Sequence, residues 1–512
     1  CQANLGTLMH ILTADLRHAD IELLFQPLQQ WLDPAALLFE RGAAWYVQQY
    51  RQQTNPHRHP VCMIITQAHY HLAKQRWRGY NLIISGENME DIEKRYQAAL
   101  DYIYSFVDYS LTKQLTYSPE KFNLDRMVKL LDLLDNPHRK YPVIHITGTK
   151  GKGSVSAFLS SILFQAGYRV GLYTSPHLLE YTERIQIDGK PIEKEEFLTI
   201  LEEIKPKIDQ VAEITTFEIT TALAMEVFAR REVDIAVLEV GLGGRLDATN
   251  VVDPVASVIT TVSYDHQAVL GDTLAAIAGE KAGIIKPGRP VIVSDQSSEA
   301  YKVIEARANE LGSPLLYVGR DVFSVAVSHN LDGQRFRLWQ PHQQMRMDEF
   351  LEHPETVAWR PDEYVTPLLG AHQIANAATA YLTVQAVRSA GYVISDQAVE
   401  AGFLNVSWHC RFEVISRRPL IILDSAHNRD SAQKLRITLD DYLPGRKILL
   451  LFGASEDKDV RGILTDLLPR IDAVVATQTI HPRAMEVASI VKLVHQMGKP
   501  ARAVLPFQSA FE

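Results

Sequence analysis

The chain has 512 residues, of which 46% are hydrophobic and 22% are charged, and its formal net charge is −9. These proportions are typical of a folded soluble protein, and the length suggests about three or four domains. The negative charge argues against a general nucleic-acid surface, and no apolar run is long enough for a membrane span. Three widely spaced cysteines, odd in number and without metal-site spacing, fit a reducing cytoplasm: Cys1, Cys62 and Cys410.

Residues 1–92 differ in pattern from the rest of the chain. They contain two helical patterns, Leu23 to Leu38 and Ala43 to Gln52, and one strand-like run from Val61 to Thr66. We therefore expect a mostly helical N-terminal extension, to which no chemical motif assigns a role. Four histidines lack carboxylate or cysteine ligands at suitable spacing, which favours solvated side chains over a metal site: His57, His59, His69 and His71.

From Tyr96 onward, strand-like and helical patterns alternate, as in a parallel sheet covered by helices on both faces. The first block of predicted strands comprises Val143–Thr147, Val170–Tyr173, Ile235–Val240, Ala256–Val262 and Pro290–Val293. A second block starts near Leu420 and comprises Leu420–Leu423, Lys447–Phe452 and Ala473–Ala476. Between the blocks, Leu316 to Trp339 alternates apolar and polar residues and predicts a small β excursion.

A glycine-rich turn follows the first predicted strand of this region. The stretch from Val143 to Ser154 runs from an apolar β-branched strand through Gly-Thr-Lys-Gly-Lys-Gly-Ser into an apolar helical pattern, Val155 to Ala166. Strand, glycine loop and helix in this order predict a phosphate loop, in which backbone N–H groups and the helix N-terminus hold phosphate. Lys152 would reach the terminal phosphates, and the Ser154 hydroxyl would ligate magnesium. A flexible linker is the alternative, but linkers do not lie between a buried strand and a helix.

Three further residues are candidates for the same site. Glu239 lies inside an apolar strand and precedes a Gly-Leu-Gly-Gly turn. A structural salt bridge is one explanation for this carboxylate, but a ligand site is more typical of a strand's carboxyl end. His266 follows another apolar strand and could share a cation with Glu239 or simply cap a helix. Lys281 falls on a helix, and its sequence position alone does not separate it from an ordinary solvated lysine.

Taken together, the motifs resemble those of the folylpolyglutamate synthase and dihydrofolate synthase family of the Mur ligase superfamily, from about Tyr96 to the chain's end. The matching motifs are Gly148-Thr-Lys-Gly-Lys-Gly-Ser154, Tyr173-Thr-Ser-Pro-His-Leu178, Glu239-Val-Gly-Leu-Gly-Gly-Arg-Leu-Asp-Ala-Thr-Asn250, Asp265-His266, Glu280-Lys-Ala-Gly283, Ala371-His-Gln-Ile-Ala-Asn-Ala377, Arg411-Phe-Glu413, Leu423-Asp-Ser-Ala-His-Asn428 and Gly453-Ala-Ser-Glu-Asp-Lys-Asp459. The resemblance implies an α/β fold with a P-loop, Mur-ligase-type ATP-binding domain over 93–405. A smaller Rossmann-like glutamate-ligase domain would follow over 406–512.

The chemistry implied by this resemblance is ATP-dependent addition of L-glutamate to a folate carboxylate through an acyl phosphate. Implied catalytic residues are Lys152, Glu239, His266 and Lys281, the last matching a lysine that is carbamylated in family members. Implied magnesium ligands are Ser154, Ser175, Glu239 and His266. Implied ATP contacts are Gly148, Thr149, Gly151, Lys152, Gly153, Ser154, Asn376, Arg411 and Asp424. Implied pterin or benzoyl contacts are Thr216, Phe217, Glu218 and Asp247, with core packing an equally good explanation for Phe217.

The chain departs from the family pattern at several points. Lys150 stands where Asn is frequent, Ser425 where many relatives have Gly, and Arg429 where Pro is common. All three look tolerable. Family members usually continue through another helix and strand beyond Glu512, so we expect an incomplete C-terminal domain of uncertain activity.

The sequence leaves several readings of function open. The preferred acceptor is a folate, and the alternatives are dihydropteroate, as in a dihydrofolate synthase, or both substrates in a bifunctional enzyme. A cell-wall Mur ligase is disfavoured by the residues from Leu242 to Asn250 and by Thr216-Phe-Glu218. A nucleotide-binding regulator without ligase activity is disfavoured by Glu239, His266 and Lys281. We expect a cytoplasmic monomer that acts on small molecules, and polyglutamate chain length is not encoded in any recognisable motif.

Overall fold

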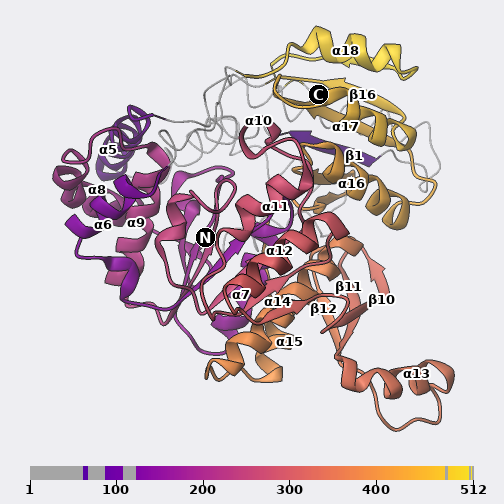
Figure 1. The fold of residues 1–512 in the computed structure, drawn as a ribbon. Helices are drawn as coiled ribbons and strands as arrows, with labels where there is room; N and C mark the ends of the chain where they lie inside the picture. The colour runs from indigo at the N-terminus through magenta and orange to yellow at the C-terminus, as the bar shows by residue number, and fades with distance from the viewer. Residues whose placement is uncertain (1–60, 67–86, 108–122, 479–482, 507–508, 510–512) are drawn as a thin grey trace, which may run out of the picture. The chain divides into compact units, whose positions relative to one another are not determined.

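The computed structural model describes residues 61–66, 87–107, 123–478, 483–506 and 509 (Figure 1). Contacts group residues 60–507 into one unit, to which everything below refers. The helices predicted at 23–38 and 43–52, and the four N-terminal histidines, lie outside the described residues. The described strands form three sheets, of eight, six and three strands.

The eight-stranded sheet has the order β5-β4-β3-β6-β2-β7-β8-β9. Six of these strands are parallel to their neighbours, while β4 and β5 add an antiparallel edge. The strands are β2 Val143–Thr147, β3 Val170–Tyr173, β4 Ile185–Ile187, β5 Lys190–Pro191, β6 Ile235–Glu239, β7 Ala256–Ile259, β8 Val291–Val293 and β9 Leu315–Tyr317. All five strands predicted for this block are confirmed, with shorter carboxyl ends for β6 and β7, and the parallel α/β architecture is confirmed with them.

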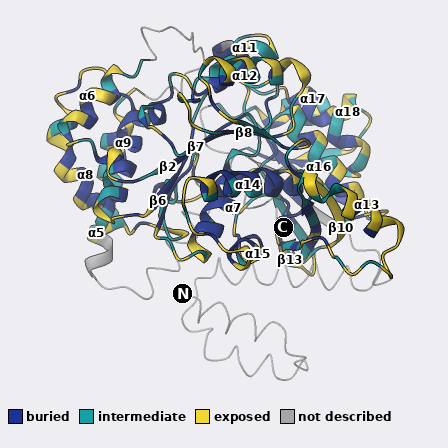
Figure 2. Cartoon of the chain, turned by 60° about the horizontal axis from the view of Figure 1, so that its bottom comes forward, coloured by how far each residue is buried: buried dark blue, intermediate teal, exposed yellow. Residues whose placement is uncertain are grey.

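Helices cover both faces of this sheet because side chains alternate along each strand. Ile144 and Ile146 of β2 pack against α7, α14 and α15, whereas Val143 packs with α5, α6, α8 and α9 on the other face (Figure 2). A further cluster joins β8 to α11 and α12. The helices are α5 Glu87–Tyr104, α6 Asp125–Leu133, α7 Lys152–Gln165, α8 Lys194–Ile208, α9 Thr216–Arg230, α10 Gln267–Leu270, α11 Leu274–Ala282, α12 Ser298–Glu310, α14 Ala371–Ser389 and α15 Asp396–Leu404.

A second sheet follows α15 and has the order β13-β14-β1-β15-β16-β17. Its strands are β13 Glu413–Arg417, β14 Leu420–Asp424, β15 Ile448–Gly453, β16 Ala473–Ala476 and β17 Ala501–Ala503, together with β1 Val61–Thr66 from the N-terminal part of the chain. Its helices are α16 Arg429–Tyr442, α17 Val460–Leu467 and α18 Val487–Gln496. The strand predicted at Val61 to Thr66 is confirmed, and it lies in the middle of a sheet whose other strands come from residues 413–503.

The predicted β excursion is confirmed as an antiparallel sheet of β10 Phe323–Asn330, β11 Gly333–Trp339 and β12 Glu363–Thr366. The segment between β11 and β12 carries α13, Gln344–Glu352. Short 3-10 helices complete the described elements: η1 Pro137–Arg139, η2 Tyr181–Arg184, η3 Ala248–Val251, η4 Pro341–Gln343 and η5 Leu468–Arg470.

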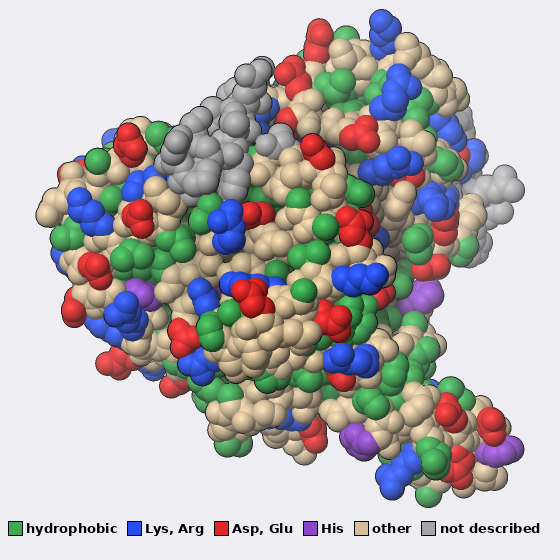
Figure 3. Space-filling view, in the orientation of Figure 1, with side chains coloured by type: hydrophobic (Ala, Val, Ile, Leu, Met, Phe, Trp, Pro, Cys, Tyr) green, Lys and Arg blue, Asp and Glu red, His purple; other side chains and the backbone are tan. Residues whose placement is uncertain are grey.

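The distribution of charged side chains on the surface agrees with the negative net charge of the sequence. On the face drawn in Figure 3, acidic and basic side chains of the described residues are interspersed, without an extended basic patch. Among the helices in the described ranges, none combines the length and the apolar character that crossing a bilayer requires.

Candidate functional site

The loop from Gly148 to Gly151 connects β2 to α7, as predicted, and α7 begins at Lys152, three residues before the predicted helical pattern. Gly151 has a φ of +93°, and a Cβ added there would lie 2.5 Å from Asn376 Oδ1. A side chain at this position would therefore be strained and would displace the Asn376 side chain of α14. The first turn of α7 contains no acidic residue, so its free N–H groups remain suited to an anion.

Two lysines converge on the carbonyl oxygen of Gly148. Lys152 Nζ donates to it at 3.3 Å, and Lys281 Nζ, reaching in from α11, donates at 3.0 Å. The Lys281 side chain is 3% exposed, and burial, followed by repulsion from Lys152, lowers its pKa to about 7. Lys281 is thus a buried amine that is partly neutral at physiological pH, which is unusual for a lysine.

A buried carboxylate lies next to these lysines. Glu239 ends β6, and its Oε1 is 3.9 Å from Lys152 Nζ while its Oε2 accepts a hydrogen bond from Ser175 N at 3.3 Å. Burial raises the pKa of Glu239, and Lys152 partly offsets this effect. His266, in a left-handed conformation with φ of +51°, lines the same cavity with a half-exposed ring. Within the described residues, no three His, Cys, Asp or Glu side chains gather as a closed cation site.

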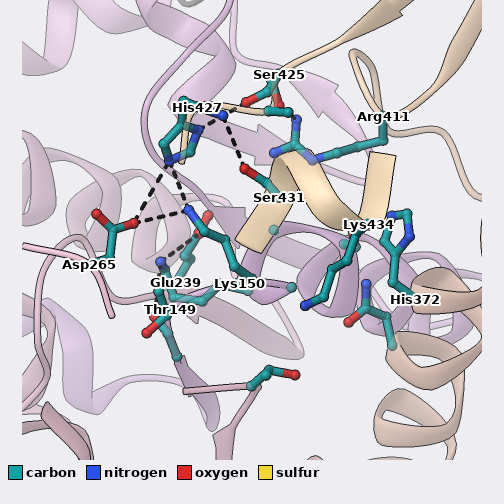
Figure 4. Close-up of a pocket in the computed structure, with 18 of the residues that line it drawn as sticks. Thr149, Lys150, Glu239, Asp265, His372, Arg411, Ser425, His427, Ser431 and Lys434 are labelled. Carbon is teal, nitrogen blue, oxygen red and sulfur yellow. Dashed lines mark hydrogen bonds and ion pairs between the residues drawn. The ribbon is translucent and has the colours of Figure 1, made fainter. Parts of the chain in front are cut away.

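A cluster of charges joins the phosphate loop to the second sheet (Figure 4). Asp265 Oδ2 accepts hydrogen bonds from Lys150 Nζ at 3.0 Å and from Asn428 Nδ2 at 2.9 Å. Lys150 Nζ is also 2.9 Å from His427 Nε2. Because His427 Nδ1 lies 2.9 Å from the carbonyl oxygen of Ser425, Nδ1 must carry the proton and Nε2 must accept from Lys150.

The charge states in this cluster follow from its burial. Burial, and then Lys150, lower the pKa of His427 to about 3, so this ring is neutral and can accept a hydrogen bond. Burial would raise the pKa of Asp265, but Lys150 and the adjacent His266 outweigh it and hold the pKa well below the usual range. Burial lowers the pKa of Lys150 to about 8, with Asp265 opposing the shift. The stable state at neutral pH is an ion pair between Lys150 and Asp265, with His427 as a neutral partner.

The second sheet contributes residues from the end of β14 and from the loop before β13. Asp424 accepts hydrogen bonds from Phe412 N at 2.9 Å and from Ala426 N at 2.8 Å. Arg411 donates to the carbonyl oxygen of Cys410 at 3.0 Å and to the Ser425 hydroxyl. Burial raises the pKa of Asp424, and Arg411 opposes the shift. A carboxylate and a guanidinium therefore face the phosphate loop from this sheet.

One cavity of about 470 Å³ collects most of the predicted site residues. The predicted residues that line it are Gly148, Thr149, Gly151, Lys152, Gly153, Ser154, Ser175, Glu239, His266, Lys281, Asn376, Arg411 and Asp424. They come from α7, β6, α11, α14 and β14 and from the loops around them, so segments far apart in the chain meet here. The cavity therefore combines a phosphate-binding loop with lysines, carboxylates and an arginine, which suits a polyphosphate ligand.

The four residues predicted to contact the pterin or benzoyl group do not line this cavity. Thr216 Oγ1 donates to the carbonyl oxygen of Ile103, and Glu218 caps α9 and pairs with Arg126 at 3.1 Å. Asp247 accepts from Leu242 N at 2.9 Å and from Thr249. Phe217 packs beneath the cavity wall, where a Cβ on Gly241 would lie 2.5 Å from its ring. Three of the four have protein partners in this state, and their substrate role stays a prediction.

Sequence reasoning missed several residues of the cavity. In the sequence, Lys150 stands out only as a departure from the family pattern, and the motifs that contain Asp265 and His427 assign these two residues no role. Trp408, in the connection before β13, does not line the cavity, but it lies so close to α7 that a Cβ on Gly153 would be 2.6 Å from its ring. Polar residues at the ends of predicted strands were a usable signal for Asp265, whereas Trp408 had none.

Comparison with known proteins agrees with this geometry. Residues 146–384 match the model of the Mur ligase middle domain, and residues 410–512 match that of the Mur ligase glutamate ligase domain. The dihydrofolate synthase/folylpolyglutamate synthase of Bacillus subtilis is 34% identical over 71% of this chain and 83% of its own length. The folylpolyglutamate synthase of Lacticaseibacillus casei is 37% identical over 65% of this chain and 76% of its own.

A solved structure is similar over most of the chain. The folylpolyglutamate synthase of Mycobacterium tuberculosis complexed with ADP has 32% sequence identity and a TM-score of 0.70, covering 81% of this chain and 90% of that one. The chain thus has a phosphate loop, a buried carboxylate and a buried lysine in one cavity, and it aligns with most of the length of these relatives. The chain belongs to the folylpolyglutamate synthase and dihydrofolate synthase family of the Mur ligase superfamily.

Proposed function

We propose that this protein is an ATP-dependent ligase that joins L-glutamate to the terminal carboxylate of a folate. The observation that carries the proposal is the cavity in which the phosphate loop, Lys152, Lys281 and Glu239 face Arg411 and Asp424. A carboxylate oxygen of the folate would attack the γ-phosphorus of ATP, and ADP would leave. The glutamate amine would then attack the resulting acyl phosphate, forming the amide and releasing phosphate and a proton.

The chain's own residues would serve this reaction mainly by positioning charge. Backbone N–H groups at the start of α7 and the Lys152 ammonium would bind the phosphates. Asn376 would contact the nucleotide from α14, and Arg411 and Asp424 would contact it from the second sheet. Because the contacts come from both sides of the cavity, we expect the two sides to close on ATP before the chemical step.

Magnesium fits the donor set of the cavity. Ser154, Ser175, Glu239 and His266 would hold it, offering two hydroxyls, one buried carboxylate and one imidazole. Mg²⁺ usually takes one or two carboxylates and fills its remaining positions with phosphate oxygens and water, so a closed protein cage is not required. When bound, the metal would neutralise phosphate charge and orient the transferring group.

Lys281 suits the carbamylation that the family resemblance implies. Carbamylation needs a neutral amine that attacks CO₂, and a pKa of about 7 supplies that amine at physiological pH. The product is an anionic carbamate, and a proton is released. The neighbouring ammonium groups of Lys152 and Lys150 favour an anion here and disfavour another cation.

Two acceptors are compatible with the family. Relatives carry the names of folylpolyglutamate synthase, dihydrofolate synthetase or both activities, so dihydropteroate is the alternative acceptor. Thr216, Phe217, Glu218 and Asp247 remain the proposed contacts to the acceptor, which would require α9 and the 241–247 loop to adjust. We further propose a cytoplasmic monomer with domain boundaries near 92 and 406, although α5, Glu87–Tyr104, spans the first of these and β1 lies in the sheet of the second domain. A regulator that only binds nucleotide is the remaining alternative.

The test is phosphate release from ATP and magnesium with L-glutamate present, comparing tetrahydrofolate with dihydropteroate. Release that requires both glutamate and tetrahydrofolate supports folylpolyglutamate synthesis. Release with dihydropteroate supports the synthase alternative or a bifunctional enzyme. ATP binding without release on either acceptor would contradict the ligase proposal and favour the regulator.

A further inference from the structure

One strand of the second sheet, β1, is distant in sequence from the other strands of that sheet. β1, residues 61–66, lies between β14 and β15 and runs parallel to both. It pairs with Ile421 to Asp424 on one side and with Ile448 to Gly453 on the other. In the part of the chain that the structure describes, β1 is the strand through which β13 and β14 are joined to β15, β16 and β17.

Without β1 the sheet would fall into a two-stranded and a three-stranded piece. Each piece would present an edge of unpaired backbone N–H and C=O groups toward the other, next to an apolar core. Met63 shows how deeply the strand is embedded, because its side chain is fully buried and packs in the cluster that includes Ile422 and Leu450. Those two residues are also its paired neighbours on β14 and β15.

The register of β1 brings its carboxyl end to the cavity side of the sheet. Ile65 pairs with Asp424, and Thr66 pairs with Gly453. Asp424 lines the cavity and ends β14; Ile65 of β1 pairs with it directly, whereas the pairing with β13 stops one residue earlier, at Leu423. Ser425, which bonds to Arg411, follows directly. The backbone that presents both groups therefore depends on pairing with residues 61–66.

We propose that residues 61–66 are an integral strand of the glutamate-ligase domain and a positioning element for its side of the nucleotide cavity. The strand closes the sheet around Met63 and fixes the end of β14, from which Asp424 and Ser425 extend. The part concerning the sheet is independent of the proposed function. The part concerning the cavity rests on the proposed function only in taking ATP as the ligand.

Hydrogen exchange of the full chain tests the strand without any substitution. Backbone amides of residues 61–66 should exchange as slowly as those of 448–453, because both lie inside the same sheet. Exchange of 61–66 at the rate of the exposed strand β10 would overturn the proposal.

Substitutions at Met63 test the consequence for the cavity. Met63→Asp places a charge in the apolar cluster and should speed exchange in β14 and β15 at least about ten-fold, while β2 and β6 stay protected. The affinity for a fluorescent ATP analogue should fall by about ten-fold or more. Met63→Leu, which conserves volume, should keep both properties within about two-fold. Met63→Ala serves as a milder variant if the aspartate variant does not fold.

The outcomes separate the two proposals. Unchanged exchange in β14 and β15 of the Met63→Asp or Met63→Ala protein would overturn the structural role. A loosened sheet with unchanged affinity for the ATP analogue would overturn the positioning role. Neither readout requires glutamate ligation, so a failure to ligate would count against the proposed function alone.

Discussion

The two walls of the cavity are built in different ways. The phosphate-loop wall is centred on one continuous strand, loop and helix, against which Lys281 of α11 and Glu239 of β6 are buried. The opposite wall comes from a sheet in which an interior strand, β1, is far away in sequence; Asp424 ends β14 of this sheet, and Arg411 precedes β13. The first wall is suited to the chemical step, because its charged groups are buried and held against the phosphate loop by direct contacts. The second is suited to binding and closure, because its placement depends on long-range pairing.

The largest effect should come from removing the buried amine of the first wall. Lys281→Ala should lower turnover by about 10²- to 10³-fold, because the carbamate and its charge are lost. The affinity for ATP should change by no more than about three-fold, since the phosphate loop remains intact. Turnover is measured by phosphate release and affinity by calorimetry.

A nearby lysine provides the matched control. Lys286 is partly buried and donates to the carbonyl oxygen of Asn250, outside the cavity. Lys286→Ala should keep turnover within about three-fold. Partial recovery of the Lys281→Ala protein by added acetate would support an anion at this position. A Lys281→Ala protein with normal turnover would remove this residue from the mechanism.

A substitution in the second wall should act mainly on binding. Arg411→Met should raise the KM for ATP by about ten- to a hundred-fold, because a charged hydrogen-bond donor is lost from the nucleotide side of the sheet. The turnover number at saturating ATP should fall much less. Arg417→Met is the control, since Arg417 lies on the same segment but bonds to Leu331 and Asp332 on the surface. Equal losses in turnover for Lys281→Ala and Arg411→Met would contradict the division between the walls.

A substitution in the cluster of Lys150, Asp265 and His427, which joins the walls, should have a smaller effect on activity and should also lower the free energy of unfolding. Lys150→Met leaves Asp265 buried without its cation, so we expect about ten-fold lower kcat/KM and a loss of about 2 kcal/mol in the free energy of unfolding. Adding Asp265→Asn should restore part of the stability, because no unpaired charge remains. Lys140→Met, which removes an exposed pair with Asp135, should cost less than about 0.5 kcal/mol. Urea denaturation measures the stabilities, and additive losses in the double variant would argue against coupling.

Most of the first wall could be predicted from the sequence. The phosphate loop, β6 with Glu239 and the parallel strands are contiguous segments whose glycines and apolar periodicity specify local structure. Their parallel arrangement then follows, because helices separate the strands. Lys281 needed the family resemblance, since a lysine on a helix has no local signal, and its burial becomes visible only in the folded chain.

The long-range contacts that complete the second wall and connect it to the first could not be predicted from local sequence patterns. The run from Val61 to Thr66 was recognisable as a strand, but hydrophobic periodicity does not specify which sheet a strand enters. The pairing of Lys150 with Asp265 and His427 likewise joins three segments that are distant in sequence. The edge strands β13 and β17 were missed because short, exposed strands have weak alternation. Long-range pairing, rather than local propensity, completes the second wall.

The smallest expected effect is on the pH dependence of the free energy of unfolding, which should change with a substitution in the first wall and not with one in the second. In the folded protein the pKa of Lys281 is about 7, well below its ordinary value of 10.5, so between these values the unfolded chain binds more protons. The free energy of unfolding should therefore rise with pH in this window, by at most about 1.4 kcal/mol per pH unit from this group. Below pH 7 both states are protonated, and this contribution becomes constant and unfavourable. In urea denaturation between pH 7 and 9 without bicarbonate, Lys281→Met should remove the part of the rise due to this group and leave the part due to Lys150, whose pKa burial lowers to about 8. Arg411→Met should retain both parts. Parallel profiles for wild type and Lys281→Met would mean that the buried amine keeps its proton, and a carbamate could not form there at neutral pH.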